Sequence, residues 1–239
     1  MTWSIIARDP ATGCLGIAVA TRFFAVGGRV PFIRSGVGAV ATQALVNPLY
    51  GPRGLRLLED GIAADEVVRL LAAADAGREH RQLHVMDRDG RSAARTGAEC
   101  VAWCGHVIGD GFSIAGNMLA GPAVVEETAR AYIEGLAALP FARRLVTALV
   151  AGEAAGGDKR GRQSAALLIH GVEEYSDLDL RVDDHVDPLA ELARLEAVSR
   201  QRWTHFRKFL PGRDSPAGIT DRAAIDAGIA ASIAAEESR

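Results

Sequence analysis

The hydrophobic positions repeat with two different periods along the chain, and the period predicts which element forms. Runs with the character of β-strands occur at residues 1–9, 15–20, 30–34, 37–44, 82–87, 91–96, 101–104, 105–108, 112–117, 164–170 and 178–182. A helical spacing of apolar residues predicts helices that begin near residues 52, 63 and 188, and helices at residues 122–138 and 141–153. The predicted order is therefore strands, two helices, strands, two helices, strands and a helix.

This order favours an α+β protein in which helices cover stacked antiparallel sheets. Asp89-Gly90 is a strong signal for a hairpin between its flanking strands. The chain changes character near its end, where residues 211–216 are rich in Pro and Gly and an Ala- and Ile-rich helix follows. We therefore expect a main domain over residues 1–210 and a helical appendage over residues 211–239.

The composition of the chain argues against nucleic acid and membranes as binding partners. The chain has 239 residues, of which 49% are hydrophobic and 24% charged, and its net charge is −3. These values are ordinary for a globular protein, and no basic field is present that would attract nucleic acid. Apolar runs reach only about ten residues, which is too short to span a bilayer, and no signal peptide is recognisable. We expect a cytoplasmic protein that binds neither nucleic acid nor a membrane.

The cysteines predict neither a disulfide framework nor a metal site. Cys14, Cys100 and Cys104 make an odd count, which favours thiols in a reducing compartment. Cys100 and Cys104 lack a second pair of ligands nearby, and His106 alone does not complete a tetrahedral zinc site. No metal and no other cofactor is therefore expected.

Thr2 stands directly behind the initiator methionine, at the start of the first predicted strand. Removal of that methionine, which is usual before a small residue, leaves Thr2 with both a hydroxyl and a free α-amine. A hydroxyl is a weak nucleophile until a base takes its proton, and an N-terminal amine can be that base. The unperturbed pKa of such an amine is about 7.7–8.0, close to working pH. The alternative is that Thr2 is an ordinary first residue of a strand.

Three polar clusters lie at strand ends in apolar surroundings. The first is Thr21-Arg22, with Arg29 nearby, and the second is Thr42-Gln43, which Asn117 matches at another strand end. The third is residues 156–166, whose polar members include Asp158, Arg160, Arg162, Gln163 and Ser164. Its glycines can free main-chain N–H groups for a carboxylate or an oxyanion, and its arginines offer a fork for a planar anion. The alternative is a solvated connecting loop.

The other residues that could carry chemistry have structural explanations. His84, His106 and His170 lie within or beside strands, and Asp183-Asp184-His185 precedes a helix cap. No Gly-x-Ser-x-Gly elbow occurs, so an α/β serine hydrolase has no support. The glycine-rich loop does not end in Gly-Lys-Ser/Thr and is therefore not a nucleotide-binding phosphate loop.

Several segments together resemble a known bacterial family, namely residues 1–9, 37–44, 50–54, 116–119 and 156–166. By these motifs the chain, from residue 1 to about 205, is identified as a member of domain of unknown function 1028. That family is grouped with the N-terminal nucleophile (Ntn) hydrolases. The resemblance implies a four-layer α/β/β/α sandwich of two antiparallel sheets. It also implies a nucleophile at the start of the first strand, the position that Thr2 occupies.

The residues and the resemblance lead to two hypotheses. In the first, the chain is an amidohydrolase whose Thr2 attacks the carbonyl of a small-molecule or peptide amide and forms an acyl-enzyme. Asn117 or Thr42, together with main-chain N–H groups, then stabilises the oxyanion. The residues expected to bind substrate, in part through a carboxylate, are Arg22, Gln43, Asp158, Arg160, Gln163 and Ser164.

In the second hypothesis, the same fold is a non-catalytic small-ligand-binding or assembly protein. Relatives in the superfamily commonly assemble through their helical layers, so the resemblance implies a homo-oligomer. The apolar helix after Pro216 is a weaker sign of a purely structural oligomer.

Overall fold

The computed structural model describes residues 2–237, and within them ten strands form two antiparallel sheets. The larger sheet has the order β10-β9-β2-β1-β8-β7. Its strands are β1 (Thr2–Arg8), β2 (Leu15–Thr21), β7 (Gly105–Gly109), β8 (Phe112–Asn117), β9 (Ser164–His170) and β10 (Leu178–Val182). The smaller sheet has the order β3-β4-β5-β6. Its strands are β3 (Pro31–Arg34), β4 (Gly38–Ala44), β5 (Arg81–Asp87) and β6 (Ser92–Thr96).

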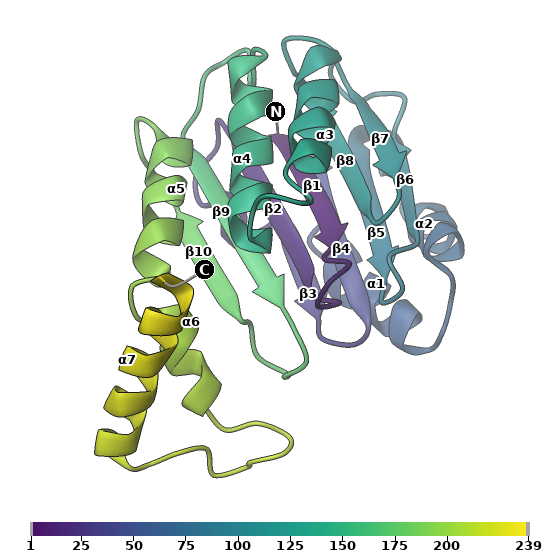
Figure 1. Cartoon of the computed structure of the whole chain (residues 1–239). Coiled ribbons are helices and arrows are strands. Elements are labelled where there is room, and N and C mark those ends of the chain that lie inside the picture. The colour runs from purple at the N-terminus through teal and green to yellow at the C-terminus, as the bar shows by residue number, and fades with distance from the viewer. Residues whose placement is uncertain (1, 238–239) are drawn as a thin grey trace. The chain divides into compact units, whose positions relative to one another are not determined.

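Helices cover the outer face of each sheet, which produces four layers (Figure 1). The smaller sheet is covered by α1 (Tyr50–Glu59) and α2 (Ala64–Ala73), and the larger sheet by α3 (Ala123–Glu134) and α4 (Phe141–Ala154). Two short 3-10 helices, η1 (Val26–Gly28) and η2 (Arg78–His80), lie in connecting segments. The predicted α+β fold, a four-layer α/β/β/α sandwich, is thereby confirmed.

β1 lies in the middle of the larger sheet, paired with β2 on one side and β8 on the other. Its side chains alternate between two covered faces. Trp3 lies against Gly152 of α4, whereas Ser4 bonds to Gln43 across the space between the sheets. Burial on both faces explains why this strand shows only a loose alternation of apolar and polar residues. Thr2 has the same parity as Ser4, so its side chain also faces the space between the sheets.

The space between the sheets has an apolar part and a polar part. The apolar part is a cluster that includes Ile6, Ile17, Val19, Ala39, Ala41 and Met86. The polar part is made of side chains that are also fully or almost fully buried: Ser4, Gln43, Gln82, His84, Ser113 and Asn117. Buried polar groups must find hydrogen-bond partners, so this polar part requires a defined arrangement of side chains.

Residues 101–104, predicted as a strand, form a loop, and that prediction was wrong. The carbonyls of Val101 and Trp103 accept hydrogen bonds from the N–H groups of Met118 and Leu119, at 2.8 and 2.9 Å. These partners belong to the irregular segment that follows β8. The main chain of residues 101–104 is therefore paired with that irregular segment and not with a strand of either sheet.

The chain divides into two compact units, Met1–Ala193 and Arg194–Arg239. The second unit begins within α5 (Pro188–Ser199) and contains α6 (Trp203–Phe206), η3 (Arg207–Phe209) and α7 (Arg222–Glu237). Inside it, His205 Nδ1 on α6 and Ser232 Oγ on α7 lie 2.8 Å apart. The predicted domain boundary at residue 210 falls within this unit. None of the described helices is long and apolar enough to cross a membrane.

Candidate active site

A cavity of about 460 Å³ opens beside the first residue of β1. It forms where β1 and β5 begin and β2, β4 and β8 end, because the antiparallel register places Thr2 opposite both Thr21 and Asn117, and Ala44 opposite Arg81. Its polar lining consists of Thr2, Thr21, Arg29, Gln43, Arg81 and Arg160. Its larger apolar lining residues are Phe23, Val26, Val30, Leu45, Val46 and Met118.

The hydroxyl of Thr2 is the nucleophile candidate in this cavity. Thr2 is 8% exposed, and its Oγ1 lies 3.1 Å from Oγ1 of Thr21. Either oxygen can donate in this contact, so Thr21 can orient the Thr2 hydroxyl without removing its proton.

Two side-chain amides hold the main-chain carbonyl of Thr2. Gln43 Nε2 donates to it at 3.3 Å and Asn117 Nδ2 at 3.4 Å. The same two nitrogens donate to Gln82 Oε1, at 2.8 and 3.0 Å. Gln82 Nε2 in turn donates to the carbonyl of Gly116 at 2.8 Å. A fully bonded buried network allows only one arrangement, so it holds the start of β1, and with it the Thr2 hydroxyl, in place.

Ser4, His84 and Ser113 extend this network deeper between the sheets. Ser4 Oγ donates to Gln43 Oε1 at 2.6 Å, so its oxygen accepts the hydrogen of His84 Nε2 at 2.9 Å. His84 Nδ1 is then the acceptor for the Ser113 hydroxyl at 3.0 Å. Burial lowers the pKa of His84 to about 3, so the ring is neutral at pH 7. His84 therefore serves as a fixed bridge in the network, in agreement with its structural explanation from the sequence.

The walls of the cavity contain strained backbone. Among the described residues, three that are not glycine adopt a left-handed conformation: Ala25, Ala44 and Met118, with φ of 54°, 69° and 55°. Ala44 and Met118 line the cavity, and Ala25 precedes the lining residue Val26. Each such residue costs about 1 kcal/mol or more, and strain of this kind concentrates at catalytic and ligand-binding sites.

Asp158 and Ser164 hold the walls of the cavity from outside. The buried carboxylate of Asp158 accepts from the N–H groups of Arg22 and Arg160, both at 2.8 Å. Arg160 also places a guanidinium nitrogen 3.2 Å from the same carboxylate. Ser164 Oγ donates to the carbonyl of Phe23 at 2.5 Å. Both residues therefore position groups that line the cavity, and Arg160 itself lines it.

Three other residues selected from the sequence lie away from the cavity lining. Arg22 and Gln163 line a different cavity of about 470 Å³, in which Gln163 Nε2 donates to Asp184 Oδ1 at 3.0 Å. Asn117 borders a smaller cavity of about 170 Å³. Because its amide nitrogen already donates to two acceptors, including the carbonyl of Thr2, Asn117 holds the strand that carries Thr2.

Thr42 lies on the opposite face of β4 from Gln43. Its Oγ1 donates to the carbonyl of Asn47 at 3.2 Å, and Val40, two residues earlier on the same face, packs with Tyr50 and Leu55 of α1. The alternation along a strand makes this separation unavoidable once Gln43 faces the larger sheet. The structure thus brings together Thr2, Gln43 and Arg160 and leaves Thr42 on the helical side.

Several lining residues were not selected from the sequence. Thr21 and Arg29 were noted only as members of a polar cluster. The hairpin that joins β1 and β2 pairs Thr2 directly with Thr21, so its register was a signal that could have selected Thr21. Arg81 and Leu45 come from β5 and from the segment after β4, and no local pattern connects them to Thr2.

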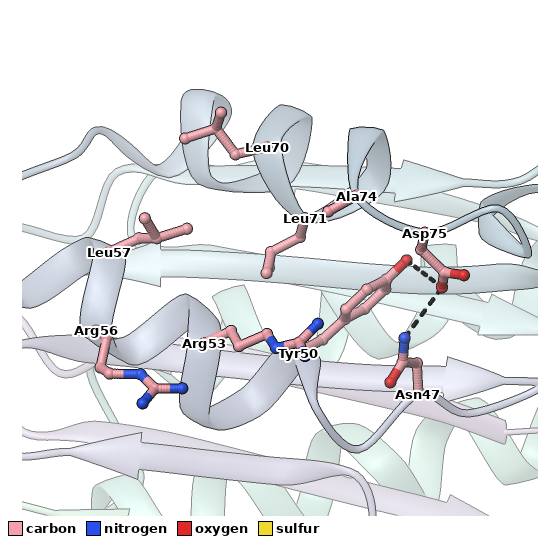
Figure 2. A pocket seen from close by; sticks show the side chains of 9 residues that line it. All are labelled: Asn47, Tyr50, Arg53, Arg56, Leu57, Leu70, Leu71, Ala74 and Asp75. Carbon is pink, nitrogen blue, oxygen red and sulfur yellow. Dashed lines mark hydrogen bonds between the residues drawn. The ribbon is translucent and has the colours of Figure 1, made fainter.

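A further cavity, of about 350 Å³, lies between α1 and α2 (Figure 2). Tyr50 Oη and Asn47 Nδ2 both donate to Asp75 Oδ2, at 2.7 and 3.0 Å. Burial, with the hydrogen bond to Asp75, raises the pKa of the Tyr50 phenol above its ordinary value. Burial opposes ionisation of Asp75, but its hydrogen bonds outweigh that effect, and the pKa of its carboxyl lies well below the ordinary range. The Tyr50 phenol and the Asp75 carboxylate are hydrogen-bonded to each other, so neither is an activated nucleophile in this cavity.

The chemistry available at Thr2 is that of a hydroxyl surrounded by cationic groups. No Asp or Glu is among the described residues that line this cavity. Across residues 2–237, no group of three or more His, Cys, Asp or Glu side chains is arranged to hold a metal ion.

Residues 2–192 match the family of unknown function DUF1028. The crystal structure of protein SPO2555 from Silicibacter pomeroyi, described as a DUF1028 protein, is 33% identical, with a TM-score of 0.86 over 92% of this chain and 96% of that chain. The fold is a sandwich of two antiparallel sheets with a threonine at the start of its central strand. The chain belongs to the DUF1028 family.

Similarity to other solved structures is weaker. Anbu (ancestral beta-subunit) from Yersinia bercovieri is 13% identical, with a TM-score of 0.40 over 88% of this chain and 98% of that chain. An Anbu (Gly-1) mutant from Hyphomicrobium sp. strain MC1 is 11% identical, with a TM-score of 0.37 over 83% and 94%. No protein with a curated function matches the chain.

Proposed function

We propose that this chain is an amidohydrolase of the Ntn superfamily, in which Thr2 attacks the carbonyl carbon of an amide in a small molecule or peptide. One observation carries the proposal: the Thr2 hydroxyl borders a cavity of about 460 Å³ at the start of the central strand, 3.1 Å from a second hydroxyl. A hydroxyl held beside its own α-amine at a chain terminus is the arrangement that N-terminal nucleophiles use.

The reaction begins once Met1, which lies outside the described residues, has been removed. The α-amine of Thr2 takes the Oγ1 proton while the oxygen attacks, so a C–O bond forms and the carbonyl oxygen becomes an oxyanion. Collapse of this intermediate breaks the C–N bond, and the leaving amine takes the proton from the α-ammonium group. Water then hydrolyses the Thr2 ester, releases a carboxylic acid and restores the hydroxyl.

The surrounding residues divide into positioning and binding groups. Gln43 and Asn117 hold the Thr2 carbonyl, and Thr21 orients its hydroxyl. Arg160 lines the cavity and belongs to the substrate-binding groups in this proposal. Oxyanion stabilisation by Asn117 or Thr42, and substrate binding by Arg22 and Gln163, stay predictions from the sequence.

An acylating probe tests the proposal without knowledge of the substrate. Protein that begins at Thr2 should react with a β-lactone and gain the mass of one acyl group, which peptide mapping should locate at Thr2. Thr2→Ala should remain unlabelled, and Thr2→Ser, which keeps the hydroxyl, should be labelled. Equal labelling of Thr2→Ala, or labelling elsewhere only, would contradict a Thr2 nucleophile.

The alternative is a non-catalytic ligand-binding or assembly protein with the same fold. The intact mass of protein purified from its natural host separates the two. A chain that begins at Thr2 supports the hydrolase, because only then is the α-amine available as a base. A chain that retains Met1 favours the alternative.

A further inference from the structure

The cavity beside Thr2 carries an excess of positive charge. Its lining includes the guanidinium groups of Arg29, Arg81 and Arg160 and, among the described residues, no carboxylate. Two of these charges are partly neutralised from outside the cavity: Arg81 lies 3.2 Å from Asp75, and Arg160 lies 3.2 Å from Asp158. A recess with this balance of charge favours an anionic ligand.

Arg29 differs from the other two arginines. Within residues 2–237 its guanidinium makes no ion pair and no hydrogen bond, although it lines the cavity. It directly follows η1, and its N–H group bonds to the carbonyl of Val26, which fixes its backbone at the cavity wall. A guanidinium presents parallel N–H donors that match the two oxygens of a carboxylate. Arg29 therefore has its full hydrogen-bonding capacity available for a ligand.

The rest of the lining is apolar and partly open to solvent. Phe23 and Leu45 line the cavity although they are 65% and 62% exposed, whereas Val26 and Val30, which also line it, are buried. Covering such side chains with the apolar part of a ligand gains about 25 cal/mol per Å² removed from water. The volume of about 460 Å³ lies within the range of small-molecule sites.

We infer that the ligand of this cavity is an amide with an apolar body and one carboxylate, and that Arg29 binds the carboxylate. The inference rests on the proposed function in that Thr2 cleaves this amide. Hydrolysis adds one water across the C–N bond and releases an acid and an amine, so no other reactant is needed. The carboxylate can belong to either product: to the amine, as in an N-acyl amino acid, or to the acyl group, as in a dicarboxylic acid monoamide.

Two matched pairs of probes distinguish these sources. N-butanoyl-leucine and N-butanoyl-leucinamide differ only in a carboxylate on the amine side. N-isobutylsuccinamic acid and N-isobutylbutanamide differ in a carboxylate on the acyl side. We expect kcat/KM to be about tenfold or more higher for the acid of at least one pair, since a hydrogen bond to a charged group contributes about 1.5–3 kcal/mol.

Arg29→Gln should lower this acid-to-neutral ratio to about threefold or less. The matched control is Arg53→Gln. Arg53 is an exposed arginine on α1 that lines the cavity between α1 and α2. It should leave the ratio unchanged. An equal loss in both variants would indicate long-range charge and would overturn the specific role of Arg29.

Binding to Thr2→Ala, measured by calorimetry, separates failure of this inference from failure of the proposed function. Turnover by the wild type without preference for the acids would overturn the inference and leave the hydrolase intact. Tighter binding of an acid to Thr2→Ala, lost when Arg29→Gln is added, would support carboxylate recognition even if the wild type cleaved nothing. Failure of all four probes to bind would overturn the ligand class.

Discussion

The cavity beside Thr2 and the cavity between α1 and α2 both combine arginines with apolar walls, but their polar groups differ in what they are free to do. Between the helices, the Asp75 carboxylate accepts hydrogen bonds from four described donors, those of Asn47, Tyr50, Gly77 and Arg81. At Thr2, the buried amides of the network instead donate to the main-chain carbonyl, and the Thr2 hydroxyl contacts the hydroxyl of Thr21. A cavity is a candidate active site when it contains a polar group that can still react with a ligand, whatever the volume of the cavity.

The two cavities are also connected through one side chain. Arg81 Nε bonds to Asp75 at 3.2 Å, and Arg81 Nη1 donates to the carbonyl of Leu45 at 2.5 Å. Arg81 and Leu45 both line the cavity beside Thr2. Asp75 is therefore a positioning residue for the wall of the Thr2 cavity, although it lies in the other one.

The largest effect is expected at Thr2 itself. Thr2→Ala should lower amide turnover by at least about a thousandfold, because loss of a nucleophile removes the covalent route. Its melting temperature should stay within a few degrees of the wild type, since the contact with Thr21 is only one hydrogen bond. Turnover that survives in Thr2→Ala would assign the chemistry to another group.

The second largest effect is expected for the substitution Asp75→Asn. The new amide places donors where the side chain now accepts from Tyr50, Asn47 and Arg81, so we expect a loss of about 2–4 kcal/mol in the free energy of unfolding by urea. Because Arg81 and Leu45 would shift, kcat/KM should also fall. Tyr50→Phe is the control: it removes one donor, leaves the Arg81 pair in place, and should cost about 1–2 kcal/mol with little change in kcat/KM.

The network around His84 and the cluster around Asp75 should lose their contributions to folding stability at different pH values. The pKa of His84 is about 3 in the folded chain and about 6.5 in the unfolded chain, so the unfolded state binds the proton first as pH falls. Stability should therefore decrease from about pH 6.5 downward, by up to about 1.4 kcal/mol per pH unit. Asp75, whose pKa is depressed below its ordinary value of 3.8, holds its contribution until the pH falls through that lower region.

A pH series of urea denaturations with the variant His84→Gln tests this separation. The variant should be less stable at pH 7 and should show a shallower decline between pH 6.5 and 4 than the wild type, because glutamine does not titrate there. The same decline in both proteins would show that other groups cause it.

The smallest effect is expected at the rim of the cavity between the helices. Arg53 and Arg56 are exposed, so Arg53→Gln and Arg56→Gln should each change the free energy of unfolding by less than about 0.5 kcal/mol. Turnover by Thr2 should be unaffected in both. A loss of turnover in either variant would mean that the cavity between α1 and α2 takes part in the function.

Much of the sandwich could be predicted from the hydrophobic pattern. Residues 164–170 and 178–182 form strands at the predicted bounds, and the helix predicted at residues 141–153 is observed as Phe141–Ala154. In such segments the spacing of apolar residues follows directly from which face of the element is buried, so the period predicts the element. Residues 101–104 show the limit: this apolar run forms a loop, and its main chain bonds to Met118 and Leu119, which are distant in sequence.

The site was predictable only where a local feature marked it. Thr2 stands out by its position at the start of a strand, and Gln43 and Arg160 by their polar clusters. Thr42 and Gln43 are neighbours in sequence, yet only Gln43 bonds to Thr2. Arg81 has no local mark at all, because Asp75 and Leu45 place it through long-range contacts.

The sequence by itself determined most of the segments that become strands and helices, and which residue begins the first strand, because burial and turn chemistry are local properties. Only the tertiary structure decided that Gln43 and Asn117 meet the carbonyl of Thr2, and that Arg29, Arg81 and Arg160 surround one cavity. The physical reason is that strand register and sheet packing depend on partners far along the chain, and the pattern of a single segment carries no record of them.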